Sequence, residues 1–112
     1  MQTVSSKLLK SVSSDINRNT LIAFFKELET DLQSQFDLLS LRPKRITSVE
    51  SYFHGDFDFI IRENEFTKLV AVIYNACKNQ GIHFILNQKS KNKKLFTFFI
   101  TNSDFITCEF WT

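Results

Sequence analysis

Two acidic residues in the run HGDFDFIIR, residues 54–62, have the types and the spacing that divalent-metal chemistry needs. Residues two apart in a β-strand share one face, so we expect Asp56 and Asp58 on the same face. Carboxylates this close repel each other unless a cation or a proton lies between them. The last apolar run, FITCEFWT, adds a further acid, Glu109. On a neighbouring strand it would complete a site for Mg²⁺ or Mn²⁺, ions that take oxygen ligands and are commonly shared with substrate phosphates.

A second interpretation is that the same acids are ordinary surface residues without a function. An antiparallel sheet with one solvated face alternates apolar and polar residues, so a D-x-D pattern also arises without a function. Two features favour a function. Ile60 would share the face of Asp56 and Asp58, so that face is not simply polar, and Glu109 interrupts an otherwise apolar run. The metal-site hypothesis fails if Glu109 lies across the sheet from the two aspartates.

The elements that must position these acids can be read from the hydrophobic periodicity. Apolar residues at three- and four-residue spacing predict an amphipathic helix over 16–35, capped by Ser14 or Asp15, after a short helix or loose arm over 1–14. Its solvated side would carry Glu27, Glu29 and Asp31. Pro43 disfavours a helix at the residue before it, which predicts a short strand over 37–42 and then a connecting loop over 44–54.

The second half of the chain is predicted to contain one helix and four strands. The strand with the two aspartates begins after Gly55, and a helix over 65–79 follows, capped by Asn64 and ended by Gly81. Three strand-like runs complete the chain, over 82–88, 94–101 and 105–111. We therefore expect one α+β domain over 1–112, with two main helices on one face of a mixed or antiparallel sheet of four to five strands.

Composition excludes several classes of protein. The net charge of +2, from 14 basic and 12 acidic residues, is too small to demand a polyanionic partner. The two cysteines lack the spacing of a zinc site or a disulfide framework, so we expect buried free thiols in a reducing compartment. We find no apolar run near the roughly 20 residues of a membrane helix and no secretory signal, and predict a cytoplasmic protein without a membrane partner.

The motif and the order of elements resemble the polymerase-β-type nucleotidyltransferase superfamily. That superfamily has the pattern h-D-h-[DE]-h on one strand, where h is a hydrophobic residue, and a third carboxylate on a later, adjacent strand. In this chain GDFDFII would provide the first pattern and CEFW the third carboxylate. The chain is similar in particular to uncharacterised bacterial nucleotidyltransferase-like proteins, some linked to surface-polysaccharide genes. LSLRPKRITSVESYFHGDFDFII matches their leucine-arginine strand followed by D-h-D-h-h, so the resemblance covers about residues 38–111.

The resemblance implies a nucleotidyltransferase-like fold and a role for each acid. Asp56 and Asp58 would hold Mg²⁺ or Mn²⁺, and Glu109 would be the third carboxylate, which helps to activate the incoming hydroxyl. A nucleoside monophosphate would pass from a nucleoside triphosphate to an acceptor of unknown identity, with pyrophosphate leaving. Two departures stand against this: the Gly-Ser pair that cradles the triphosphate in active members does not occur, and the chain is short.

These departures leave alternatives open. The chain is either a minimal enzyme, which a protein partner or a second copy could complete, or a catalytically silent module that binds other proteins. A plain partner-binding domain with decorative acids is the third hypothesis. Arg42, Lys44 and Arg45 are candidates for phosphate binding, although a solvated strand end explains them equally well.

The remaining polar residues are expected to be structural. We favour a loop residue without a role for His54 over a phosphate ligand. For the run KSKNKK, which has no interleaved aromatic residue, we favour a soluble turn over contact with nucleic acid. Trp111 would share the face of Glu109, where it walls a base pocket or covers the end of the sheet.

Overall fold

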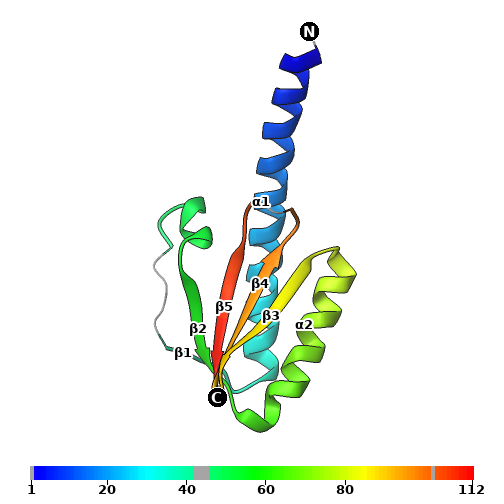
Figure 1. Ribbon diagram of the computed structural model, residues 1–112. Helices are drawn as coiled ribbons and strands as arrows, with labels where there is room; N and C mark the ends of the chain where they lie inside the picture. Colours follow the sequence, from blue (N-terminus) through cyan, green and yellow to red (C-terminus); the bar gives the residue numbers. More distant parts are fainter. Residues whose placement is uncertain (1, 42–45, 102) are drawn as a thin grey trace.

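The computed structural model describes residues 2–41, 46–101 and 103–112, with the backbone alone for residues 2–15. The chain is α+β, as the sequence predicts: two helices and an open, five-stranded mixed sheet (Figure 1). The elements in chain order are α1 (Gln2–Gln35), β1 (Leu39–Ser40), the 3-10 helix η1 (Val49–Phe53), β2 (Asp56–Ile60), the 3-10 helix η2 (Glu63–Glu65), α2 (Phe66–Gln80), β3 (His83–Ser90), β4 (Lys93–Phe99) and β5 (Ile106–Trp111).

The sheet brings the two acidic segments next to each other. Its strand order is β1-β2-β5-β4-β3, so β5, the last strand of the chain, lies between β2 and β4. The pair β2–β5 is parallel and the three other pairs are antiparallel. Because a parallel pair keeps its residues in step, each residue of β2 has one partner on β5, and the two strands place matching side chains on the same face.

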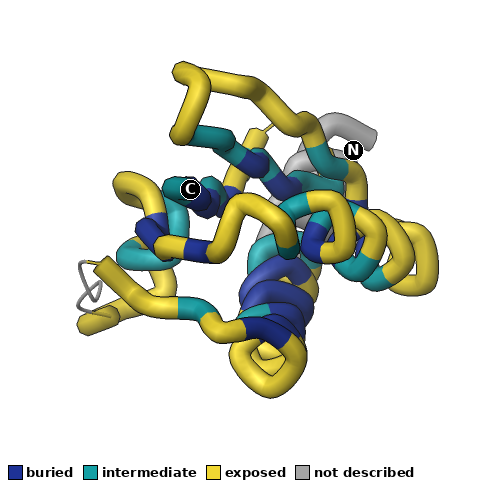
Figure 2. The backbone as a smooth tube through the Cα atoms, turned by 90° about the horizontal axis from the view of Figure 1, so that it is seen from below, coloured by how far each residue is buried: buried dark blue, intermediate teal, exposed yellow. Residues whose placement is uncertain are grey.

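Both helices pack on one face of the sheet, and the core lies between them and the strands. Figure 1 shows α1 running behind the strands, with α2 beside β3. Buried positions gather where α1 faces the sheet (Figure 2). Side chains that are at most 1% exposed come from both helices, from β4 and β5, and from the residue after β2: Leu21, Phe24, Ile61, Leu69, Ile73, Phe96, Phe98, Ile106 and Phe110. Aromatic rings dominate this core because each buries a large apolar area.

Helix α1 is longer than the sequence pattern predicts. It begins at Gln2 and not near residue 16, so Ser14 and Asp15 lie inside the helix, and the segment predicted as a short helix or a loose arm is helical and continuous with the rest of α1. The physical reason is that residues 2–35 contain neither glycine nor proline, the two residue types that break helices most strongly. Figure 1 shows the first half of α1 projecting beyond the sheet.

Glu29 is a second correction on α1. Glu27 and Asp31 are exposed, as predicted, but Glu29 is half-buried and lines a small apolar space with Leu28, Leu32 and strand residues. Burial raises the pKa of its carboxyl group above the ordinary value.

Several boundaries around the acids differ by a few residues. The predicted strand over 37–42 is only two residues long, β1, and the loop predicted after it contains η1; residues 42–45 lie outside the described residues. Asn64 does not cap α2, because η2 intervenes and Glu65 precedes the helix. Gly81 ends α2 as predicted, with a φ of 68° in the left-handed region that favours glycine.

The three C-terminal strands are confirmed, and β3 and β4 extend further into the basic run 89–94 than predicted, leaving a turn at 91–92. Among the described residues, no helix combines the length and the apolar character needed to span a membrane.

Candidate functional site

The three acids lie on the face of the sheet opposite the helices, which we call the open face. In the parallel register Asp58 is the partner of Glu109, and Asp56 is the partner of Thr107. The neighbouring residues Phe57, Phe59, Cys108 and Phe110 are buried in the core on the helical face. Because residues in register share a face, Asp58 and Glu109 stand side by side, about 4.8 Å apart at the backbone. The sequence prediction that the three acids share one face is therefore confirmed.

Asp58 and Glu109 are buried although neither α1 nor α2 packs on the open face in the described part of the chain. Asp58 is 9% exposed and Glu109 is 5% exposed. Asp58 and Glu109 lie side by side on neighbouring strands, with Leu41 next to Asp58 and Leu95 next to Glu109. Leu41 donates its backbone N–H to the Asp58 carbonyl oxygen at 3.0 Å, and Leu95 of β4 is the partner of Glu109. Two carboxylates in such a position are costly unless cations or hydrogen bonds compensate them.

Lys93 provides a cation beside Glu109. Its Nζ lies 3.4 Å from Glu109 Oε1, and it also lies 4.8 Å from the centroid of the Trp111 ring. Lys93 and Trp111 are partners in the antiparallel register of β4 and β5, so both side chains belong to the open face. The sequence interpretation placed Lys93 in a solubilising turn and missed this position, because the alignment of β4 against β5 is needed to find it.

Asp56 is exposed and lies at the edge of the acidic row. The Thr107 hydroxyl donates to Asp56 Oδ1 and lies 3.2 Å from the Gly55 carbonyl oxygen. Thr107 was also missed from the sequence, for the same reason as Lys93. Gly55 has a φ of 76°, a conformation that directs the chain into β2 and favours glycine.

Of the other residues that the sequence singled out, the structure describes His54 and Trp111. Arg42, Lys44 and Arg45, the predicted phosphate-binding group, lie outside the described residues. His54 is exposed and follows η1 directly. Trp111 shares the face of Glu109, as predicted, and its indole N–H is buried without a hydrogen-bond acceptor among the described residues.

The donors on the open face decide whether a divalent cation fits there. Within the described residues, no group of three or more His, Cys, Asp or Glu side chains could hold a metal ion. The donor chemistry nevertheless suits Mg²⁺, because the ion is usually bound through one or two carboxylates together with waters and substrate phosphates. Asp58 and Glu109 offer two adjacent carboxylates, so they suit an ion that takes its remaining ligands from water or from another molecule.

Neither cysteine is poised for nucleophilic chemistry. Both thiols are free and buried, as predicted. Burial raises the pKa of Cys77 to about 12, and burial together with the nearby carboxylates raises the pKa of Cys108 well above its ordinary value. A thiol must be deprotonated to act as a nucleophile, so these two are inert in the folded chain. Cys108 also lies on the face opposite Glu109, which excludes a direct pairing of the two.

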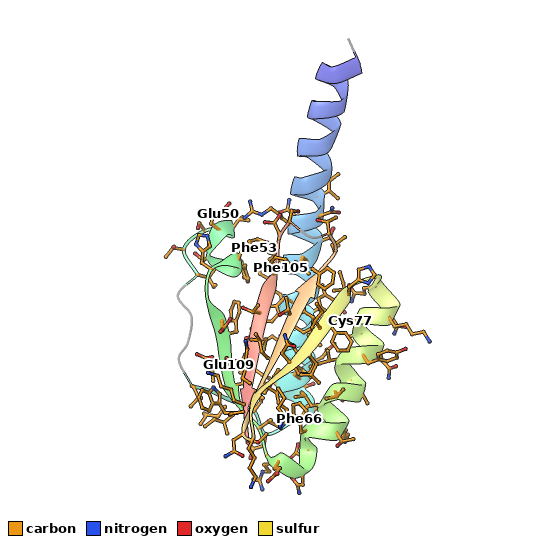
Figure 3. All side chains as sticks on the ribbon, viewed as in Figure 1. Glu50, Phe53, Phe66, Cys77, Phe105 and Glu109 are labelled. Atoms are coloured by element: carbon orange, nitrogen blue, oxygen red, sulfur yellow. The ribbon has the colours of Figure 1, made fainter. Side chains whose placement is uncertain are left out.

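A second charged cluster lies at the other end of the sheet and is structural. Arg18 of α1 contacts Glu50 at 2.7 Å and Asp104 at 3.6 Å, and its guanidinium lies 4.5 Å from the centre of the Phe53 ring. The hydrogen bond from Arg18 lowers the pKa of Glu50. In Figure 3, Glu50 and Phe53 lie at the end of the sheet away from Glu109. The cluster ties α1 to η1 and to the loop before β5.

Comparisons with known proteins leave the family open: no family model matches the chain, and neither does any curated protein or solved structure.

Proposed function

We propose that this chain is a nucleotidyltransferase-like protein that binds a nucleoside triphosphate together with Mg²⁺ on the open face. Asp56, Asp58 and Glu109 would hold the ion, with Glu109 as the third carboxylate, and a nucleoside monophosphate would be transferred to an acceptor hydroxyl. The observation that carries this proposal is the parallel register of Asp58 and Glu109, two neighbouring carboxylates kept buried on a face that neither helix covers.

The same geometry favours an ion that is shared with a ligand over one that is bound permanently. Three acids already gathered around one point would favour a permanently bound metal, but the described residues do not form such a group. Two adjacent carboxylates leave most of the octahedral positions of Mg²⁺ to other oxygen ligands. We therefore expect the ion alone to bind weakly and the complex of the ion with a triphosphate to bind more tightly.

In the transfer step, the acceptor oxygen attacks the α-phosphorus, the bond from that phosphorus to the bridging oxygen breaks, and pyrophosphate leaves. The bound ion would supply neutralisation of the phosphate charge. Asp56 and Asp58 would hold the ion, and Glu109 would accept the proton of the acceptor hydroxyl at its carboxylate. Glu109 can do so only after the Lys93 ammonium, 3.4 Å away, has left it.

A silent interaction module is the second candidate, and one observation favours it. Glu109 already has an ammonium ion as its neighbour, which would allow a relic site to keep its acid without a metal. The absence of a Gly-Ser pair points the same way. In that case the exposed apolar residues of the open face, Leu39, Leu41 and Ile60, are the surface that a protein partner would cover.

Calorimetric titration separates the two candidates. The wild type is titrated with Mg²⁺ and with Mn²⁺, each with and without ATP, and compared with the double variant Asp56→Asn, Asp58→Asn. The double variant Glu27→Gln, Asp31→Asn is the matched control, because it removes two exposed acids from α1. The nucleotidyltransferase proposal expects binding that requires both site acids and is tightened by ATP.

Two other results would decide against this proposal. Absence of any binding to the wild type, with the site variant at least as stable, would identify the acids as a relic and favour the interaction module. Equal loss of binding in the site variant and the α1 control would mean that net charge, and not the site, attracts the ligand.

A further inference from the structure

We infer that Lys93 is an internal cation that competes with the divalent ion for Glu109 and, once displaced, becomes a contact for the nucleotide's phosphates. The inference rests on the proposed function for both the metal ion and the nucleotide. It assigns a positioning role to a residue that the sequence placed in a solubilising turn.

The first step of the argument is the geometry of the pair. Lys93 Nζ lies 3.4 Å from Glu109 Oε1, and the Glu109 side chain is only 7% exposed, whereas the Lys93 side chain is 33% exposed. The ammonium is therefore the more solvent-accessible partner of a pair whose carboxylate is buried. An ion that binds Glu109 has to share that carboxylate with Lys93 or replace it.

The second step is electrostatic. An ammonium and a divalent cation on the same carboxylate repel each other strongly in a partly buried site. The lysine side chain has a flexible four-carbon stem, so it can swing away from Glu109 when a divalent ion replaces its charge. Glu109 is buried on the central strand β5 and has less freedom to move. Binding of an ion at Glu109 would therefore displace the ammonium.

The third step concerns what the released ammonium meets. A triphosphate held by an ion at Asp58 and Glu109 would place anionic oxygens beside Lys93, and ammonium groups bind phosphate well. A second donor lies next to it. The Trp111 indole N–H is buried and has no acceptor among the described residues, a deficiency that a ligand oxygen or a bridging water would remove.

The two halves of the inference predict opposite effects of one substitution. In Lys93→Met the competitor is gone, so Mg²⁺ alone should bind about tenfold more tightly. The phosphate contact is also gone, so Mg²⁺ with ATP should bind about tenfold more weakly. Lys94→Met is the matched control, because Lys94 is the next residue of β4, faces the helices and lies 4.4 Å from the Phe66 ring centroid. It should change neither affinity.

Tryptophan fluorescence gives a readout that does not depend on activity. Trp111 is the single tryptophan of the chain, and the Lys93 ammonium lies over its ring. Adding Mg²⁺ to the wild type should change the emission as the ammonium leaves, and the change should be absent in Lys93→Met. Lys93→Arg keeps the charge if the methionine variant does not fold. It should retain ATP-dependent binding and the weak binding of the metal alone.

The outcomes distinguish the inference from the proposed function. If the wild type binds Mg²⁺ with ATP but Lys93→Met and Lys94→Met behave alike, Lys93 is only a structural counter-ion and the inference is wrong while the function stands. If the wild type binds neither the ion nor the complex, the proposed function fails and the inference fails with it.

Discussion

The pairing of Lys93 with Glu109 should make a measurable contribution to folding that a surface ion pair does not. The two charges are 3.4 Å apart. Coulomb's law gives about 5 kcal/mol at an effective dielectric constant near 20 and about 1 kcal/mol in water. Glu109 is buried while Lys93 is partly solvated, so we expect a coupling free energy of about 2 kcal/mol, above the 0.2–1 kcal/mol typical of exposed pairs.

The single substitutions should be unequal. Lys93→Met leaves the buried Glu109 carboxylate without its ammonium and next to Asp58, so it should cost more stability than the coupling itself. Glu109→Gln leaves a lysine that can turn to water, so its cost should be smaller. The double variant should be closer to the wild type than the sum of the singles predicts.

Urea denaturation at pH 7 of the wild type, both singles and the double variant measures this coupling, provided that unfolding is two-state. Repeating the cycle at high salt should reduce the coupling only in part, because buried pairs are screened less than exposed ones. The matched variant Lys94→Met should show no coupling with Glu109→Gln. A cycle that closes within about 0.5 kcal/mol would refute the reasoning, since Lys93 would then not be what compensates Glu109.

Three further predictions concern other parts of the fold. Glu29→Gln should raise the free energy of unfolding at neutral pH, because the raised pKa of Glu29 means that ionisation of its carboxyl group opposes folding. The difference from the wild type should develop as pH rises through the folded-state pKa of Glu29 and vanish in acid, where the carboxyl group is protonated. Thermal melts at a series of pH values measure it. Cys77, with a pKa of about 12, should be thiolate in only about one molecule in ten thousand at pH 8. A maleimide or disulfide reagent should therefore modify Cys77 and Cys108 at the rate of unfolding, and fast labelling of the native chain would contradict their burial. Gly81→Ala should lower the free energy of unfolding by about 1 kcal/mol, measured by urea titration, because alanine is strained at the positive φ of this position. Gly81→Asn should lower it by less, because asparagine tolerates the left-handed region better. Equal stability of the wild type and both variants would argue against the left-handed cap.

The fold was predictable where local patterns are strong. Alternating apolar residues located β2, β4 and β5, and Gly81 located the end of α2. The start of α1 was not predictable from the same kind of signal. Ser14 and Asp15 are good capping residues, but a cap is used only where the chain leaves the helix, and nothing between Gln2 and Gln35 forces it to do so.

The site was predictable only in part, for a related reason. The pattern D-x-D fixes Asp56 and Asp58 on one face, because the period of a strand is a local property. That Glu109 stands beside Asp58 depends on the register of two strands about fifty residues apart, and the resemblance to a known family supplied that expectation. Lys93 and Thr107 depend on the same registers but carry no motif, so nothing in the sequence singled them out.

The positions of the two glycines bear on whether backbone amides or side chains would bind a phosphate group. Backbone amides at a glycine-rich helix start are the usual cradle for a triphosphate. This chain has two glycines, and both have other tasks: Gly55 leads into β2 and Gly81 ends α2. The start of α2 is preceded by the acids Glu63 and Glu65, which would repel a phosphate. In the part of the chain that the structure describes, a bound triphosphate would therefore depend on side-chain cations and on a metal ion. Such binding weakens with salt more than a backbone cradle does, because mobile charges are screened. A nucleotide affinity that is insensitive to salt would contradict this view of the open face.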